Sequence, residues 1–171
     1  MDQYSLVLVI AILALFFSML TFFLFTLDRK KPKVNSLSSL SDHSRNLQLQ
    51  AYERLVILSE RISIPNLVSR SNQPGIGAKE MQLLLLDTIK QEFEYNASQQ
   101  IYVSPVAWDA VRNLKDQNML IINQVAATLP QDSTSLDLNK KLMEFVMTQK
   151  KGNIHTIVLE ALNYEAKKVM R

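Results

Sequence analysis

Residues 3–27, QYSLVLVIAILALFFSMLTFFLFTL, contain no charged side chain, and 16 of these 25 residues are Leu, Ile, Val or Phe. As an α-helix such a segment is about 37 Å long, which exceeds the roughly 30 Å hydrocarbon core of a bilayer. A helix also pairs its own backbone polar groups, as a chain in lipid must. The segment therefore predicts an N-terminal transmembrane helix rather than a buried core helix.

Basic residues follow this segment and none precede it. The four are Arg29, Lys30, Lys31 and Lys33. A secretory signal peptide has the reverse order, with positive charge before the apolar run, so we expect an uncleaved, single-pass anchor. The positive-inside rule places the N-terminus outside and the C-terminal part in the cytoplasm. The same four side chains are predicted to attract anionic lipid headgroups.

Small residues recur along the apolar segment with spacings of three, four and three. They are Ala11, Ala14, Ser18 and Thr21. On a helix these positions form one stripe, and such stripes let transmembrane helices approach closely. The stripe is therefore a candidate helix-packing surface, which makes a homo-oligomer one possible assembly.

The remainder of the chain has helical spacing of apolar residues and no sustained strand alternation. The predicted fold class is all-α: a transmembrane helix (3–27), a basic juxtamembrane segment and Ser-rich linker (28–44), and a compact cytoplasmic domain of four to five helices (45–171). We expect one helix that ends before Pro65. Four more are expected to span about 78–97, 105–129, 135–149 and 153–170. Four consecutive leucines at 83–86 predict that the helix over 78–97 is covered on more than one side.

Helix signals support these boundaries. Ser104 followed by Pro105 is typical of an N-cap and first helical residue, and Asn153 is suited to cap the last helix. Residues 101–103, Ile-Tyr-Val, have extended propensity but are too few to form a sheet. The five prolines argue against a continuous coiled-coil stalk.

Composition excludes several kinds of site. The chain has no cysteine, so disulfides, iron–sulfur clusters and Cys-ligated zinc are excluded. His43 and His155 lack a second ligand at zinc-binding helical spacing, and the Gly75–Gly77 loop lacks the residues of a phosphate loop. Residues 34–171 carry 15 basic and 14 acidic side chains, a balance of +1, which does not favour nucleic-acid binding. We therefore predict no catalytic, cofactor-binding or metal-binding residues and no cofactor.

Two residues of the helix after Ser104 stand out. Trp108 is predicted to anchor that helix in the core. Asn118 lies on the same apolar stripe as Val111 and Leu114, so it is either a buried polar group or part of a small pocket. In either position it needs hydrogen-bonding partners.

Two stretches carry a resemblance: AYERLVILSERISIPNLVSR (51–70) and EFEYNASQQIYVSPVAWDAV (92–111). Together with the apolar segment and its basic flank, they resemble an uncharacterised family of single-span membrane proteins from Bacteroidetes-type bacteria. The resemblance implies a bacterial inner-membrane location and no activity, cofactor or catalytic residue. Within it, Gln99, Gln100, Tyr102 and Trp108 form a candidate interaction surface, the alternative being a capped turn that docks Tyr102 and Trp108 into the core.

These observations favour a non-enzymatic interaction or scaffold module on the cytoplasmic face of a membrane. Its helical faces would bind another protein, or two copies would associate through the Ala11–Thr21 stripe. An alternative is an enzyme or small-ligand binder with a site between helices, near Asn118 and Tyr102. A stalk-like subunit of a membrane complex is a further alternative.

Overall fold

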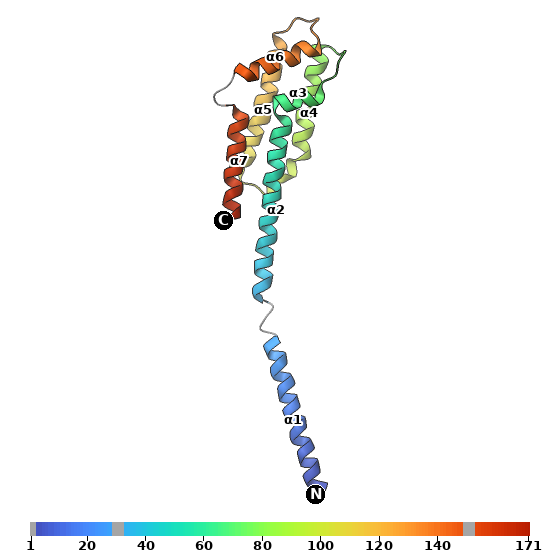
Figure 1. Cartoon of the computed structure of the whole chain (residues 1–171), viewed down its shortest axis with the longest axis vertical. Coiled ribbons are helices and arrows are strands. Elements are labelled where there is room, and N and C mark those ends of the chain that lie inside the picture. The colour runs from blue at the N-terminus through green and yellow to red at the C-terminus, as the bar shows by residue number, and fades with distance from the viewer. Residues whose placement is uncertain (1–2, 29–32, 149–152) are drawn as a thin grey trace. The chain divides into compact units, whose positions relative to one another are not determined.

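The computed structural model describes residues 3–28, 33–148 and 153–171. Their elements are helices (Figure 1): α1 (Gln3–Asp28), α2 (Lys33–Ile62), α3 (Ile64–Ser71), α4 (Ala78–Tyr95), the 3₁₀ helix η1 (Ala97–Ile101), α5 (Pro105–Ala127), α6 (Ser135–Thr148) and α7 (Ile154–Met170). The all-helical part of the predicted fold class is thus observed.

The transmembrane part of that fold class is wrong. Within the described residues, no helix combines the length and the sustained apolar character that crossing a bilayer requires. The predicted single-pass inner-membrane location, with the N-terminus outside and a cytoplasmic C-terminal domain, is corrected on the same ground.

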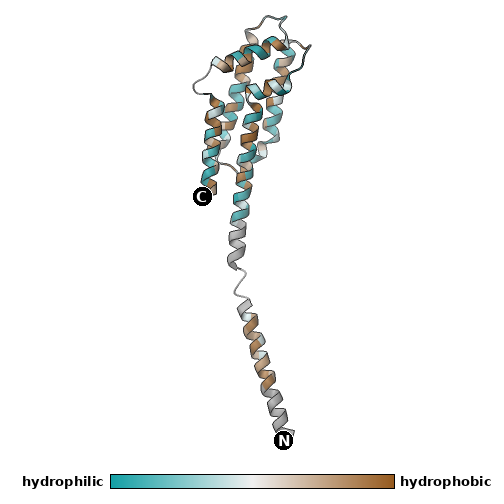
Figure 2. Ribbon diagram, viewed as in Figure 1, coloured by the Kyte–Doolittle hydropathy of each residue, from teal (hydrophilic) through white to brown (hydrophobic). Residues whose placement is uncertain are grey.

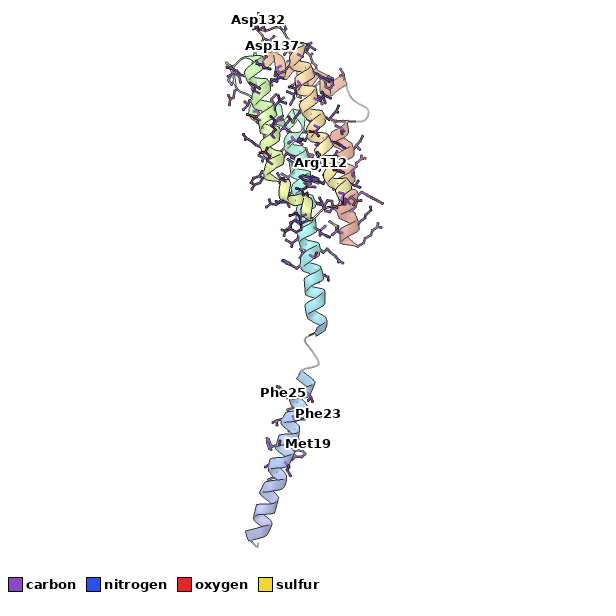
Figure 3. All side chains as sticks on the ribbon, turned by 180° about the vertical axis from the view of Figure 1, so that it is seen from behind. Met19, Phe23, Phe25, Arg112, Asp132 and Asp137 are labelled. Atoms are coloured by element: carbon purple, nitrogen blue, oxygen red, sulfur yellow. The ribbon has the colours of Figure 1, made fainter. Side chains whose placement is uncertain are left out.

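The described side chains of α1 are nevertheless strongly apolar (Figure 2). Ten large hydrophobic residues between Leu13 and Phe25 are 40–77% exposed. Met19, Phe23 and Phe25 extend outward from the helix (Figure 3). The hydroxyls of Thr21 and Thr26 donate to carbonyls three residues earlier, so these polar groups are satisfied within α1.

The chain divides into two compact units, residues 1–44 and 45–171. In the second unit, α4 packs on α5 and α6, and α5 also packs on α7. The C-terminal part of α2 runs beside these helices, whereas α3 and α6 cross one end of the bundle (Figure 1). One hydrophobic core joins all of these helices, and its largest fully buried side chains include Leu58, Met81, Leu114, Leu142 and Leu162.

The predicted helix starts agree closely with the observed ones. The Ser104 hydroxyl accepts from the Ala107 N–H, and Pro105 occupies the first helical turn. The Asn153 side chain accepts from the His155 N–H at the start of α7. Each side chain satisfies a backbone donor that the first turn leaves without a helical partner.

Two local predictions differ from the structure. Of the leucine run, Leu85 is buried and Leu84 and Leu86 are half-buried, but Leu83 is 53% exposed, so α4 is not covered on every side. Ile101 ends the 3₁₀ helix η1 instead of lying in an extended segment. The short path from α4 to α5 leaves room for a tight turn, and this tertiary constraint overrides strand propensity.

Two loops pair at the end of the bundle. Gly77 and Thr134 form an antiparallel bridge, in which the Ala78 N–H donates to the Ser133 carbonyl and the Ser135 N–H donates to the Ile76 carbonyl. The loop before α4 is thereby fixed to the loop before α6.

Candidate functional site

The candidate site surrounds the break between α2 and α3. Ser63 has ψ 137°, outside the helical region, and Pro65 has no N–H to donate to the Arg61 carbonyl. Side chains replace the missing helical hydrogen bonds. The Ser63 hydroxyl and the Asn66 amide donate to the Glu60 carbonyl, and the Arg70 guanidinium donates to the Arg61 carbonyl.

Asn118 supplies the hydrogen-bond donor for a third backbone carbonyl at the break, that of Ile62. Its amide nitrogen donates to the Ile62 carbonyl over 2.8 Å, and the side chain is buried. This bond joins α5 to the end of α2, so the partner that the sequence required but could not name is a backbone group 56 residues earlier. Because this bond uses the amide nitrogen, the amide oxygen is left as the acceptor of Asn118.

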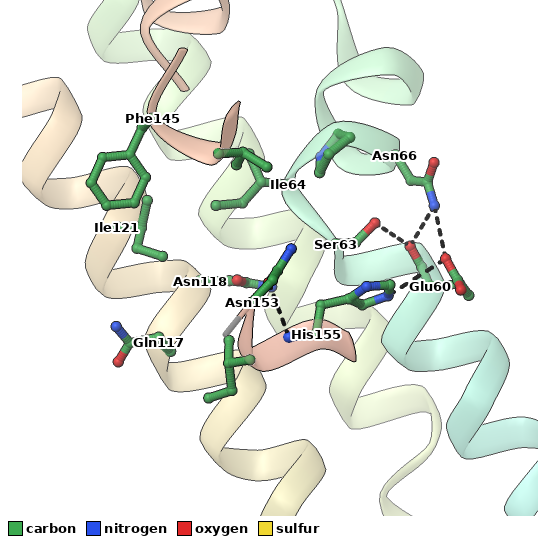
Figure 4. A pocket seen from close by; sticks show the side chains of 13 residues that line it. Glu60, Ser63, Ile64, Asn66, Gln117, Asn118, Ile121, Phe145, Asn153 and His155 are labelled. Carbon is green, nitrogen blue, oxygen red and sulfur yellow. Dashed lines mark hydrogen bonds and ion pairs between the residues drawn. The ribbon is translucent and has the colours of Figure 1, made fainter. Parts of the chain in front are cut away.

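A pocket of about 360 Å³ opens beside this bond. Its volume lies within the usual range for small-molecule sites. Its polar lining includes Glu60, Ser63, Asn66, Asn118, Asn153 and His155. Its apolar lining comprises Ile64, Pro65, Ile121, Phe145, Val146 and Ile154. The pocket therefore has one hydrogen-bonding side and one hydrophobic side, contributed by five helices (Figure 4).

His155 and Glu60 face each other across the mouth of this pocket. Figure 4 shows the imidazole pointing toward the carboxylate, with Nε2 of His155 3.5 Å from Oε2 of Glu60. This His155 nitrogen is buried and makes no hydrogen bond, because the contact with Glu60 is too long or poorly aligned for one. This pair could not be predicted, because Glu60 and His155 are far apart in the sequence of residues 45–171 and meet only in the folded unit.

Behind the break, Glu92 of α4 joins two arginines. Arg61 donates from Nε and Nη2 to its carboxylate over 2.6–2.9 Å, and Arg70 donates over 3.3 Å. Burial raises the pKa of Glu92, but the hydrogen bonds and positive charges of Arg61 and Arg70 outweigh burial and hold the pKa below its ordinary value. This cluster stabilises the α2–α3 junction that forms the pocket.

Replacing Glu92 by Gln is expected to lower the free energy of unfolding at pH 7 by about 1 kcal/mol, since a half-exposed ion-pair network contributes modestly. The native carboxylate stabilises the fold above its unfolded-state pKa, and this contribution is lost as the pH falls through the lowered folded-state pKa. Urea unfolding between pH 7 and pH 3 is therefore expected to show a shallower acid loss for Glu92→Gln than for the native chain. Glu94→Gln, at an exposed position of α4, is the control and is expected to follow the native profile.

The predicted surface around Gln99–Ser104 divides between core and exterior. Trp108 is buried, with its ring centroid 5.0 Å from that of Phe93, as the core-anchor interpretation expects. Tyr102 is 40% exposed and Ile101 is 75% exposed. Gln99 is half-buried and Gln100 is exposed on η1, where the Gln100 amide donates to the Ala97 carbonyl.

Tyr102 lines a second hollow, not the Asn118 pocket. This η1 groove, of about 390 Å³, is bounded by Tyr52, Ile101, Tyr102, Val103 and Val169, together with the polar residues Gln48, Ser104, Glu165 and Lys168. The Tyr52 hydroxyl accepts from the Ser104 N–H at its base. The structure thus separates Tyr102 from Asn118, which the small-ligand hypothesis had placed at one site.

Other predicted residues are placed only in part. Ala14, Ser18 and Thr21 are exposed on α1, whereas the side chain of Ala11 lies outside the described part. Arg29, Lys30 and Lys31, and the side chain of Lys33, also lie outside it. Helix packing through the stripe and lipid binding by the basic residues remain predictions. In the described part, no group of three or more acidic or histidine side chains is arranged to hold a metal ion.

A family model described as a family of unknown function, DUF7935, matches residues 2–169. The chain belongs to this family. No curated protein and no solved structure matches it. The match confirms that the chain resembles an uncharacterised family over nearly its whole length, and it assigns no activity to any residue.

Proposed function

We propose that this DUF7935 chain is a helical interaction module rather than an enzyme, and that its partner is a second copy of itself. The observation that carries the proposal is the η1 groove, where protruding and recessed apolar side chains occur together. Ile101 protrudes at the rim, whereas Tyr52 is buried at the base. A two-fold interface requires this combination, because the same surface must supply both the inserted side chain and the hollow.

The charged residues of the η1 groove favour an apolar occupant. Lys168 donates to the Glu165 carboxylate over 2.6 Å, and this hydrogen bond holds the pKa of Glu165 below its usual range. The Lys168 ammonium also lies 4.4 Å from the centroid of the Tyr164 ring. With both charges satisfied by neighbours, the groove is suited to an aliphatic side chain such as Ile101 of the second copy.

Replacing Ile101 by Asn is expected to weaken self-association of the full chain at least about a hundredfold, because a two-fold interface buries Ile101 of both copies and each large aliphatic side chain contributes about 1.5–3 kcal/mol. Sedimentation velocity over a concentration series measures the dissociation constant. Leu136→Asn is the matched control, since Leu136 is 68% exposed on α6 and does not line the groove. Equal dissociation constants for the native chain and Ile101→Asn would show that the groove is not the interface.

The Asn118 pocket supports a second candidate function, the binding of a small ligand between helices. It is concave and combines several polar side chains with an apolar wall, as ligand sites commonly do.

We also propose the bacterial, Bacteroidetes-type origin that the sequence resemblance implies. The description of the matching family names no organism.

A further inference from the structure

The charge of the Asn118 pocket restricts what it accepts. Among the described residues that line it, Glu60 supplies a carboxylate and no lysine or arginine takes part. The nearest arginines of the α2–α3 break, Arg61 and Arg70, bind Glu92 instead and do not line the pocket. Within the described lining, the Glu60 carboxylate would repel a bound anion and attract a cation.

The polar side of the pocket is also rich in acceptors. In His155 the Nε2 atom is buried without a hydrogen bond. The Glu60 carboxylate is 3.5 Å away and accepts from the Asn66 amide over 3.2 Å, whereas Asn118 keeps its amide oxygen and its second amide hydrogen. The Glu60 carboxylate can only accept, so a ligand that donates to it gains a charge-assisted hydrogen bond.

We propose that this pocket binds a small organic cation, a primary amine on a short aliphatic or aromatic body. The ammonium group donates to the Glu60 carboxylate. The body of the ligand lies against Ile121 and Phe145 on the apolar side. This inference rests on the second candidate function, small-ligand binding, and adds the chemical class of the ligand.

The test compares three probes of one shape: phenethylamine, 2-phenylethanol and phenylacetate, which are cationic, neutral and anionic at pH 7. Each is titrated into the isotopically labelled full chain, and amide shifts of residues around the pocket are followed by NMR. We expect phenethylamine to bind at least about tenfold more tightly than the alcohol, the size of one charge-assisted hydrogen bond. Phenylacetate is expected to bind more weakly than either.

Glu60→Gln and Glu53→Gln form a matched pair on α2, since Glu53 is exposed and does not line the pocket. Glu60→Gln is expected to weaken phenethylamine binding about tenfold while leaving binding of the alcohol unchanged, and Glu53→Gln is expected to change neither. The amide spectrum of each variant shows whether it is folded.

The outcomes separate the ligand class from the binding function. Binding of the alcohol or phenylacetate as tightly as the amine would overturn the proposed cation while leaving ligand binding in place. Absence of binding by all three probes would overturn both. A further probe is Nα-acetyl-lysine amide, which keeps its side-chain ammonium. If it binds more tightly than phenethylamine, the proposed ligand, a small free amine, is wrong, and the ligand is instead a lysine side chain of a protein.

Discussion

Replacing Trp108 by Ala is expected to lower the free energy of unfolding by about 3–5 kcal/mol, the usual loss when a large buried aromatic side chain is removed from a core. Trp108 is 6% exposed, and its ring packs against that of Phe93. Phe93 in turn lies beneath the Lys115 ammonium, 4.8 Å from the ring centroid. The substitution therefore removes the contact that joins α5 to α4 near the start of α5.

Urea unfolding followed by circular dichroism measures this loss. The matched control is Val106→Ala, two residues earlier, where the native side chain is 71% exposed and a loss within about 0.5 kcal/mol is expected. Since Trp108 is the one tryptophan of the sequence, its fluorescence in the native chain reports the same transition directly. A loss below 1 kcal/mol for Trp108→Ala would contradict its assignment to the core.

Replacing Asn118 by Leu, which has a similar volume, is expected to lower the free energy of unfolding by about 1–3 kcal/mol. The Ile62 carbonyl then lies at a buried position without its hydrogen-bond donor. Asn118→Asp is expected to cost more, about 3 kcal/mol at neutral pH, because a buried carboxylate then faces a carbonyl oxygen. If Asn118 were an ordinary exposed polar residue, we would expect the reverse order, with Asn118→Asp tolerated and Asn118→Leu unfavourable.

The same unfolding measurement distinguishes these cases. Asn113→Leu is the control on α5, since Asn113 is exposed. Its expected change is within about 0.5 kcal/mol. Stability of Asn118→Asp equal to that of the native chain would show that Asn118 does not bridge α5 and the end of α2.

The helix starts and the core anchor could be predicted because they depend on local chemistry. Ser104 before Pro105 specifies a helix start whatever the rest of the fold does. Trp108 and Val111 follow on the buried side of the same helix, and the apolar spacing identified that side.

The pocket could not be predicted because its residues meet only through the tertiary fold. Asn118 was recognised as a polar residue on an apolar stripe, but its partner belongs to α2. His155 was judged by its neighbours in sequence, and Glu60 is not among them. One local signal was available: Pro65 deprives the Arg61 carbonyl of its helical donor, which marks the α2–α3 break beside which the pocket opens.

Two further predictions failed for identifiable reasons. The leucine run at 83–86 does cover all directions around a helix axis, but α4 is packed on only part of its circumference, which leaves Leu83 exposed. The apolar run at 3–27 was interpreted as a membrane span from its composition, and the described helices include none that meets the requirements of one.

The central claim is that residues 45–171 form one bundle that unites segments distant in the chain, and a disulfide cross-link tests it most directly. Gly77 and Thr134 face each other as a non-hydrogen-bonded antiparallel pair, for which the Cα atoms are about 4.5 Å apart. That separation suits a disulfide. The chain has no cysteine of its own, and a Cβ at Gly77 meets nothing within 4 Å.

The full chain carrying Gly77→Cys and Thr134→Cys is expected to form an intramolecular disulfide under mild oxidation, measured by mass spectrometry as the loss of two hydrogens in the monomer. The control pairs Gly77→Cys with Thr148→Cys at the far end of α6, about 20 Å away along the helix, and is expected to stay reduced. A reduced Gly77/Thr134 pair, or equal oxidation of both pairs, would contradict the bundle and with it the pocket and the η1 groove.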